Sequence, residues 1–483
     1  MTYSTMFARD VRASPQFAMI VVSLAMFTDL FIYGSTIPVL PFALTSRLKV
    51  PEDEVQKWNA VMLGTFGASM LLGSLIFGYL SDRIHSRRAP YLVGLLFEAL
   101  GTALVSFTPN LPVTILSRGL QGLSCGIVYT VGYALVVDKV GSQCLGKVFG
   151  YLNLSMSLGW FMGPPIGGLL FDKLGYLAVF VPGMVLILID GTLRLLMISN
   201  EGGPKICQEE PISPEPSIAG PSNQTLVDPV SDEIKAIPVT PHRHVILVLL
   251  TSPRVLVAAL GQFVLIVGIG SMDTIFPVFM KDTFNFNSLH VALFMLILLV
   301  PLLIAPLFGS ATDRFGAKVV GVFAFSLSTM AFILLRFVTE HTVREMVLFG
   351  AMLFVLGITF ALANPAVAVE IVRSVEAISL KTPGVFGGHS PAAQAYSIGV
   401  AVQGIGLTVG SLGIGYFRIR FGWAAMSTFL GAVTFVELLL MLCITGGTLG
   451  IFSKLRWGRV SDMLFLMSGV RPDSQGGKAV IKE

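Results

Sequence analysis

Charged residues are scarce in this sequence, and their scarcity excludes an ordinary water-soluble protein. Asp, Glu, Lys and Arg make up 12% of the 483 residues, whereas hydrophobic residues make up 54%. A soluble globular chain is typically about a quarter charged, so this chain cannot cover itself with a conventional polar surface. With a mean hydropathy of +0.80, the composition is typical of a protein that spends most of its length in lipid.

Cysteine is also rare, and no recognisable catalytic or metal-binding pattern is present. Cys125, Cys144, Cys207 and Cys443 have no CxxC or Cys/His spacing, so we expect neither a disulfide framework nor a metal site. No Ser/His/Asp group or phosphate loop points to an enzyme. The net charge of +4 is spread over many short loops and forms no nucleic-acid surface. We therefore expect no enzyme, no cofactor and no nucleic-acid partner.

The sequence consists largely of repeated long apolar segments. The runs are about 20 residues long, which is the length that crosses a hydrocarbon core as a helix. In lipid, backbone polar groups must be paired within their own segment, so such runs form helices. The first run, from Gln16 to about Leu44, is too long for a signal-peptide core and is predicted to stay in the membrane. We predict an all-α polytopic membrane protein with twelve spans, near 17–41, 58–80, 90–108, 112–136, 147–171, 177–198, 247–280, 289–309, 317–337, 344–369, 393–416 and 424–446.

The positions of Lys and Arg predict the orientation of these spans. Cytoplasmic loops carry an excess of basic residues. With the N-terminus placed inside, the basic residues at the even-numbered span ends fall on the cytoplasmic side: Arg83, Arg87, Arg88, Lys139, Lys147, Arg314, Lys318, Arg373 and Lys381. We therefore expect both termini to be cytoplasmic.

The spans divide into two groups of six. Residues 200–246 are rich in Pro, Ser and acidic residues and have no apolar period, so they are predicted to be a disordered cytoplasmic linker. The predicted organisation is an N-terminal tail (1–16), a six-helix bundle (17–199), this linker, a second six-helix bundle (247–446) and a C-terminal tail (447–483).

The two bundles are internal repeats. "GYLSDRIHSRR" after span two matches "GSATDRFGAK" after span eight, and "TDLFIYGSTIPVLPF" in span one aligns loosely with "MDTIFPVFMKDTF" in span seven. At one constant offset, four glycines of span five fall on four glycines of span eleven: Gly159, Gly163, Gly168 and Gly175 on Gly406, Gly410, Gly415 and Gly422. Two equivalent bundles can rock about a site between them, as alternating access requires.

Three motifs in the first bundle resemble signatures of the major facilitator superfamily. The first lies between helices two and three (Gly78-x-x-x-Asp82-Arg83, then Arg87-Arg88), and the second lies in helix four (Arg118-Gly119-x-Gln121-Gly122). The third lies in helix five and is typical of proton-driven drug antiporters (Gly159-x-x-x-Gly163-Pro164-x-x-Gly167-Gly168). The resemblance implies the major facilitator fold of two six-helix bundles, and it covers the chain outside the tails and linker.

The acidic residues of helices one and seven resemble those of one group within the superfamily. Asp29, followed by Pro38 and Pro41, is similar to the first helix of vesicular amine transporters and related twelve-helix multidrug and fungal secondary-metabolite exporters. Asp273 sits like the acidic residue of helix seven in that group. The chain differs from the amine transporters in having Phe360 and Val400 where they carry acids.

Ionisable residues within spans are costly and need a reason. The resemblance implies that helices one, four, seven and ten line a central cavity. This places Asp29 and Asp273 there, one from each bundle. A carboxyl group that is poised between burial and a nearby cation can exchange protons near neutral pH. We hypothesise that Asp29 is the main proton and cation site, helped by Asp273; hydrogen bonding for helix packing is the alternative for both.

Neighbouring residues complete the predicted substrate and proton site. Tyr33 is one turn beyond Asp29 on the same helix face and either lines the substrate path or packs. Arg118 lies at a similar depth and either pairs with ionised Asp29, as a switch, or forms a fixed structural ion pair. Gln121, from the same motif, is included in the site.

Other buried charges are predicted to be structural. Asp190 and Arg194 are spaced i, i+4 and can neutralise each other. Glu98 and Glu437 lie on helices that the resemblance assigns to the outer scaffold, where we expect neighbouring helices to hold them.

A conformational gate is predicted at the cytoplasmic ends of helices two and four, with a weaker counterpart in the second bundle; the alternative is that these residues only fix loop orientation. Its residues are Gly78, Asp82, Arg83, Arg87, Arg88, Asp138, Asp313, Arg314 and Glu370. The helix-five motif either seals the antiporter against leak or serves close packing, since Gly allows close approach and Pro removes a hydrogen-bond donor.

The sequence thus favours a monomeric, proton-gradient-driven antiporter in the lipid bilayer that exports a small lipophilic compound, cationic compounds included. A drug, toxin or secondary metabolite fits this description, and the plasma membrane is favoured over a vacuolar or vesicular membrane. The alternatives are a facilitator or H⁺ symporter that imports a nutrient, and a membrane receptor without transport.

Overall fold

The computed structural model describes residues 12, 14–83, 88–140, 145–197, 253–381 and 391–444. Throughout these ranges the regular elements are helices. The predicted linker (200–246), the C-terminal tail (447–483), residues 1–11 and the first residues of the seventh span (247–252) lie outside the described residues.

The first half contains six long helices. The first crossing is α2 (Pro15–Thr36), which the short α3 (Leu40–Ser46) and η1 (Glu52–Glu54) follow. The remaining crossings are α4 (Val55–Arg83), α5 (Arg88–Phe107), α6 (Leu111–Val140), α7 (Leu145–Leu174) and α8 (Tyr176–Leu196). The first span is shorter than predicted because α2 stops before Pro38, and Pro41 instead occupies the first turn of α3.

The second half also makes six crossings, although some are interrupted. α10 (Pro253–Phe284) is followed by a crossing in three pieces: α11 (Ser288–Leu299), the 3₁₀ stretch η3 (Val300–Ile304) and α12 (Ala305–Phe315). Then come α13 (Ala317–Leu335), α14 (Val343–Lys381), α15 (Pro391–Thr408), the π-helical stretch η4 (Val409–Ile414) and α16 (Gly415–Ile444). At Gly422 the backbone φ is 82°, and this kink divides α16 between two crossings.

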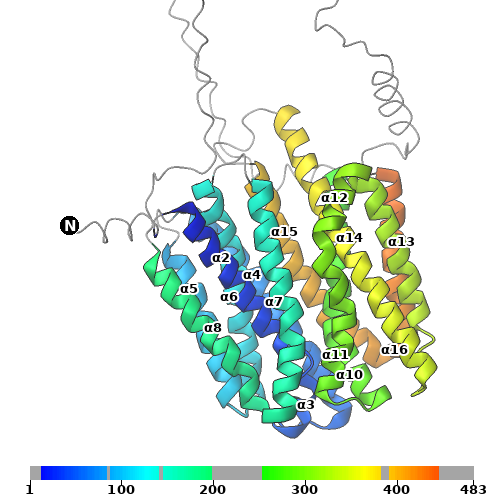
Figure 1. Cartoon of the computed structure of the whole chain (residues 1–483). Coiled ribbons are helices and arrows are strands. Elements are labelled where there is room, and N and C mark those ends of the chain that lie inside the picture. Colours follow the sequence, from blue (N-terminus) through cyan, green and yellow to red (C-terminus); the bar gives the residue numbers. More distant parts are fainter. Residues whose placement is uncertain are drawn as a thin grey trace, which may run out of the picture.

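Ten of these helices are long and apolar enough to cross a membrane. The stretch Gly399–Cys443 counts as one of them although it turns at Gly422, and the Ser288–Ile304 segment is apolar but falls below the length limit. Gly399–Cys443 makes two crossings and the segment that contains Ser288–Ile304 makes one more, so the described residues contain the predicted twelve transmembrane helices. The two halves lie side by side and meet along α4, α7, α11 and α15 (Figure 1).

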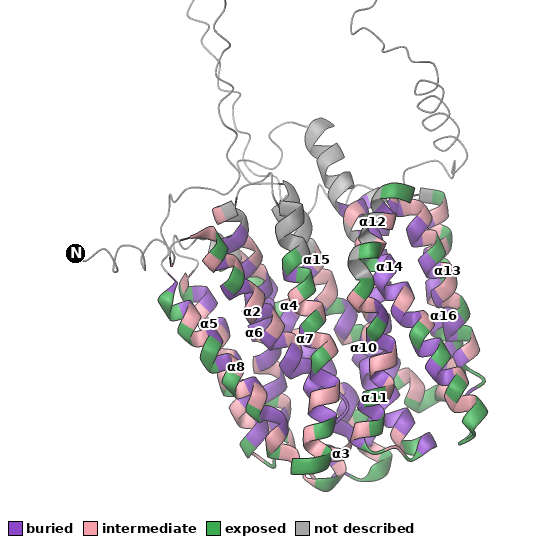
Figure 2. Ribbon diagram, in the orientation of Figure 1, coloured by how far each residue is buried: buried purple, intermediate pink, exposed green. Residues whose placement is uncertain are grey.

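Exposed residues lie on the outward faces of the bundle (Figure 2), and many of them are large apolar residues. On α8 these include Leu177, Val181, Leu188 and Leu195. In water such a face would be unstable, but hydrocarbon tails match it. The exposure pattern therefore agrees with the membrane setting that the composition predicts.

The internal repeat is visible in the contacts of the aligned glycines. A Cβ at Gly163 of α7 would lie 2.7 Å from the backbone N of Ser35 in α2, and a Cβ at Gly410 of η4 would lie 2.4 Å from the backbone O of Val267 in α10. In each half, therefore, the fifth crossing packs its glycine against the backbone of the first crossing.

The remaining aligned glycines agree as well. Gly168 faces Ala292 of the second half, and Gly415 faces Ala60 of the first half. Gly175 and Gly422, which end the two equivalent crossings, have φ values of 85° and 82°. L residues with a side chain rarely adopt that region, so glycine is required at both turns.

Gly167 tests the close packing of α7 on α2. A Cβ there would lie 2.0 Å from the backbone O of Ser35, so Gly167→Ala must push two backbones apart. We expect destabilisation of about 1–3 kcal/mol, read as a lower apparent melting temperature of the purified protein. Gly399→Ala is the matched control, because a Cβ at Gly399 meets nothing within 4 Å. Equal melting temperatures for the two variants would contradict the packing.

Candidate functional site

The hydrogen bond between Tyr33 and Asp273 joins the two halves in the interior of the molecule. The hydroxyl of Tyr33 on α2 donates to Oδ2 of Asp273 on α10 at 2.9 Å. Tyr33 is 5% exposed and Asp273 is fully buried. Two residues that the sequence places in one site, 240 positions apart, are therefore in direct contact.

The surroundings of this bond come from three helices. The Tyr33 ring lies 4.8 Å from the Phe66 ring of α4, centroid to centroid. Beside Asp273, the Nδ2 of Asn59, also from α4, donates to the backbone O of Thr274 at 2.6 Å. The second oxygen of Asp273, Oδ1, is buried without a hydrogen-bond partner. The carboxyl group thus has one oxygen engaged with the first half and one oxygen free to accept a donor.

Asp29 lies one turn before Tyr33 but belongs to a different environment. It is 5% exposed, and its Oδ2 has no hydrogen-bond partner. The charges that act on it come from Arg194 and Asp190 of α8, within the first half. The structure therefore places Asp29 in the interior of the first bundle and Asp273 at the boundary between the bundles.

Arg118 is fully buried on α6 and is not ion-paired with Asp29 in this structure. Its Nη1 donates to Oε1 of Gln121 at 2.9 Å, and Nε2 of Gln121 donates to the hydroxyl of Thr102 at 3.1 Å. Nε and Nη2 of Arg118 have no partner. The predicted switch between Arg118 and Asp29 is thus absent from this conformation, because Gln121 takes the guanidinium instead.

Asp190 and Arg194 form the structural pair that their spacing predicts. Their side chains are 2.5 Å apart and almost fully buried. Arg194 also donates from Nη1 to the backbone O of Tyr91 at 2.7 Å, and its guanidinium lies 3.9 Å from the centre of the Tyr91 ring. This pair therefore fixes α8 to α5.

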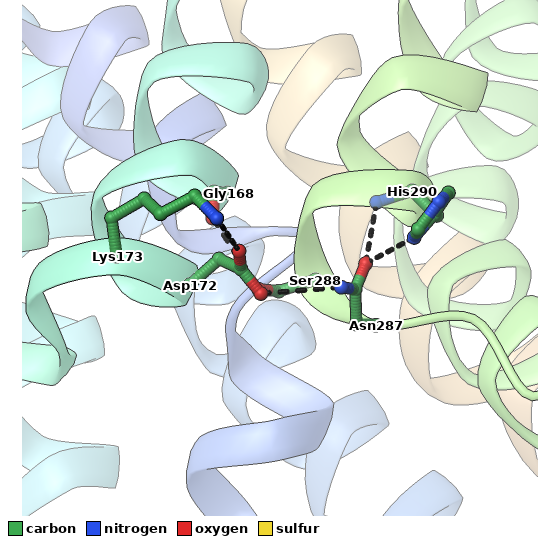
Figure 3. A network of polar contacts seen from close by, with 6 residues as sticks. All are labelled: Gly168, Asp172, Lys173, Asn287, Ser288 and His290. Carbon is green, nitrogen blue, oxygen red and sulfur yellow. Dashed lines mark hydrogen bonds and ion pairs between the residues drawn. The ribbon is translucent and has the colours of Figure 1, made fainter.

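A second group of contacts joins the halves at the end of the molecule that holds α3 (Figure 3). Nδ2 of Asn287 donates to Oδ1 of Asp172, at the C-terminal end of α7, at 3.2 Å, and the hydroxyl of Ser288 donates to the backbone O of Gly168 at 3.3 Å. Oδ1 of Asn287 accepts the backbone N–H of His290 at 2.9 Å and so caps α11. One residue, Asn287, both starts α11 and holds it against α7.

Further contacts at this end come from η1, α4, α10 and α16. Nζ of Lys281 lies 2.9 Å from Oε2 of Glu52, and Nη1 of Arg418 donates to Oε1 of Gln56. We call the full set the outer clasp: Glu52–Lys281, Gln56–Arg418, Asn59–Thr274, Gly168–Ser288 and Asp172–Asn287. Sequence reasoning missed it, because polar residues near span ends look like ordinary loop residues until their partners from the other half are known.

The predicted cytoplasmic gate is only partly described. Arg88 donates from Nη2 to the backbone O of Leu195 at 2.6 Å, and Arg12 donates from Nε to the backbone O of Leu196 at 2.8 Å, so both cations cap the C-terminal end of α8. Gly78 packs beside Thr130 of α6.

In the second half, Glu370 is buried and Arg314 is exposed. The side chains of Asp82, Arg83, Asp138 and Asp313, and all of Arg87, lie outside the described residues.

The helix-five motif makes two kinds of contact. Gly159, Gly163 and Gly167 face the backbone of α2, and the Cδ of Pro164 lies beside Gly34 of the same helix. Gly168 instead faces α11 of the other half. Close packing accounts for the first three glycines, while Gly168 belongs to the boundary that must change when the halves move.

Comparison with known proteins gives consistent matches over most of the chain. The profile of the Major Facilitator Superfamily matches residues 22–380. An uncharacterized MFS-type transporter of Schizosaccharomyces pombe is 30% identical over 441 residues, which cover 89% of this chain and 94% of that protein. The multidrug resistance protein MdtG of Proteus mirabilis is 24% identical over 411 residues, with 84% and 90% covered.

Two further matches are more distant. A probable vesicular acetylcholine transporter of Danio rerio is 27% identical over 194 residues, 39% of each chain. The crystal structure of the human organic anion transporter MFSD10 superposes with a TM-score of 0.60 at 16% identity, covering 88% of this chain and 99% of that one. This likeness confirms the predicted fold of two six-helix bundles.

Cysteine cross-linking tests the outer clasp. In a variant without the native cysteines, D172C/N287C should form a disulfide on mild oxidation, because the native side chains touch across the boundary. A protease site is inserted into residues 200–246, and the protein is cleaved there after oxidation. On a denaturing gel the two halves then run apart unless the disulfide joins them. K173C/N287C is the matched control, since Lys173 is turned about 100° around the helix from Asp172. Equal cross-linking of both pairs would contradict the described contact.

Proposed function

Because this chain belongs to the Major Facilitator Superfamily of secondary transporters, we propose that it is a proton-coupled antiporter that exports a small lipophilic organic compound. The observation that carries the proposal is the hydrogen bond between Tyr33 and Asp273. A buried carboxyl group that joins the halves changes its partner when they part. A proton or a substrate cation on that carboxyl group therefore competes with the contact that holds the halves together.

The charge of the second half favours a cationic substrate at Asp273. The acids buried in its described residues are Asp273, Glu370 and Glu437, and no buried Lys or Arg accompanies them there. An isolated carboxylate at membrane depth is costly unless it is neutralised. A proton neutralises Asp273 in one state of the cycle, and an amine or another lipophilic cation does so in the next.

Asp29 is better suited to the proton than to the substrate. The guanidinium group of Arg194, in its own bundle, already acts on it electrostatically. A bulky organic cation would have to enter a bundle interior that is closely packed against α7. We therefore divide the tasks that the sequence assigned mainly to Asp29: Asp29 holds the proton, and Asp273 and Tyr33 contact the substrate.

The outer clasp fits an export cycle. With the N-terminus placed in the cytoplasm, the α3 end faces the outside, so the structure is closed toward the side where an exported compound leaves. Two of the five clasp contacts are neutral hydrogen bonds, each contributing about 0.5–1.5 kcal/mol, and the other three involve a charged side chain near the membrane surface. A set of that size can hold the closed state and still break on the timescale of transport.

The name of one relative, the multidrug resistance protein MdtG, supports a broad lipophilic substrate class for this chain. We propose that the present protein lies in the plasma membrane.

Proton coupling is tested in proteoliposomes that contain the purified protein. With an acidic interior, the vesicles should accumulate members of a probe panel of ethidium, tetraphenylphosphonium and the neutral toxin cycloheximide. Asp29→Asn should abolish gradient-driven accumulation of every transported probe while the protein still reconstitutes. Transport that is independent of the gradient in the wild type would instead indicate a facilitator.

Asp273→Asn tests the substrate contact separately. Hydrogen bonds to a charged group contribute about 1.5–3 kcal/mol, so uptake of cationic probes at low concentration should fall by at least about tenfold. Neutral probes that the wild type transports should be retained. Tyr33→Phe is the matched variant, because it removes only the 2.9 Å bond and leaves the carboxylate in place. An equal loss of neutral and cationic probes in Asp273→Asn would refute the division of tasks.

A further inference from the structure

Glu98 on α5 is a buried carboxyl group that the proposed cycle does not yet use. It is 3% exposed, and its helix is the third crossing, which the resemblance to the superfamily assigns to the outer scaffold. An acid at that depth is costly if it faces only apolar side chains. Its neighbours therefore decide whether it is a packing residue or part of the transport machinery.

One face of α5 fixes where Glu98 points. Gly94, Glu98 and Gly101 share this face, being spaced by four and three residues. A Cβ at Gly94 would lie 3.1 Å from Cγ2 of Ile127, and a Cβ at Gly101 would lie 2.9 Å from Cγ of Gln121. Glu98 thus faces α6 between these two residues, beside Ser124. This side of α6 also carries Arg118.

The other two neighbouring helices bring further charges. On α8, Gly191 packs against Leu95 of α5, and Arg194 donates to the backbone O of Tyr91. Glu98 interacts electrostatically with Asp29 of α2, Arg118 of α6 and Arg194 of α8. It also acts on the thiol of Cys125 on α6, and Arg194 is in turn paired with Asp190.

The charges in this cluster do not balance when every group is ionised. Among the described residues of the first half, the buried ionisable side chains comprise three acids (Asp29, Glu98, Asp190) and two guanidinium groups (Arg118, Arg194). Asp190 and Arg194 neutralise each other at 2.5 Å. Asp29 and Glu98 are left with Arg118 alone. Since Arg keeps its charge in proteins, one proton on the two acids brings the cluster to neutrality.

Arg118 has the free donors that such an arrangement needs. Nη1 is engaged with Gln121, whereas Nε and Nη2 are buried without partners. Oδ2 of Asp29 is likewise buried without a partner. The guanidinium of Arg118 therefore has donors left for an acid that loses its proton.

We infer that Asp29 and Glu98 form one proton-binding site, in which the two carboxyl groups share a single proton and Arg118 balances the remaining charge. This inference rests on the proposed proton coupling and extends it to a second acid. On release, the O–H bond of the neutral acid breaks, the proton passes to water, and both groups are then carboxylates. On uptake the reverse occurs, and no other reactant is needed.

Infrared difference spectroscopy of the purified protein between mildly acidic and alkaline pH tests this site without any substrate. The band of protonated carboxyl groups reports the shared proton. Removing either acid leaves one carboxylate and one guanidinium, which balance without a proton. Asp29→Asn and Glu98→Gln should therefore each remove the same single band, and Glu98→Asp should restore it.

Glu437→Gln is the control, because Glu437 is buried in the second half beside Gly261, far from the cluster in sequence and fold. Any change that Glu437→Gln makes in the carboxyl band should simply add to the change made by Asp29→Asn when the two substitutions are combined. The inference is overturned if Glu98→Gln leaves the band intact, or if it removes a band that Asp29→Asn retains.

Gradient-driven uptake by the same variants separates this inference from the proposed function. Glu98→Gln should lose coupling as completely as Asp29→Asn. A shared band in a protein that shows no gradient-driven uptake would refute the antiporter while supporting the shared site. Normal coupling in Glu98→Gln would refute the shared site while leaving the antiporter in place.

Discussion

The cost of an unbalanced charge in hydrocarbon controls the arrangement of this protein. Every buried ionisable group in its described spans has to be paired, neutralised by a proton, or neutralised by a ligand. The first half contains both acids and guanidinium groups, and so it can hold most of its charge internally. The second half buries acids without a buried basic residue among its described parts. This asymmetry is chemical and not architectural, since the two halves share one fold.

The shared fold depends on backbone contacts that only glycine permits. The fifth crossing of each half lies directly against the backbone of the first, so the helices that carry Asp29 and Asp273 are each held on one side by a glycine-rich neighbour. A rigid backing of this kind keeps the acid at a fixed depth while the bundle moves as one body. The side chains at the centre can then differ between halves without any change in the scaffold.

Much of this could be predicted from the sequence. Apolar run length gave the number of crossings, and the constant spacing between aligned glycines identified the repeat, because both depend on local properties of the chain. The sequence assigned Tyr33 and Asp273 to the same site, but the hydrogen bond between them came only from the structure. The partner of Arg118 did not follow, because depth alone does not say which way a long side chain turns. The direction in which Glu98 faces did not follow either, because the position of a helix within the bundle does not determine which face of it carries a polar residue inward.

Gly167 and Gly168 are adjacent in the chain but serve different states of the molecule. Gly167 touches α2 within its own half, so that contact persists whichever way the transporter faces. Gly168 touches Ala292 across the boundary, and this contact exists only while the outer side is shut. One added methyl group at position 168 would therefore act as a wedge against closure at the α3 end, and would give a means of trapping the protein open at that end.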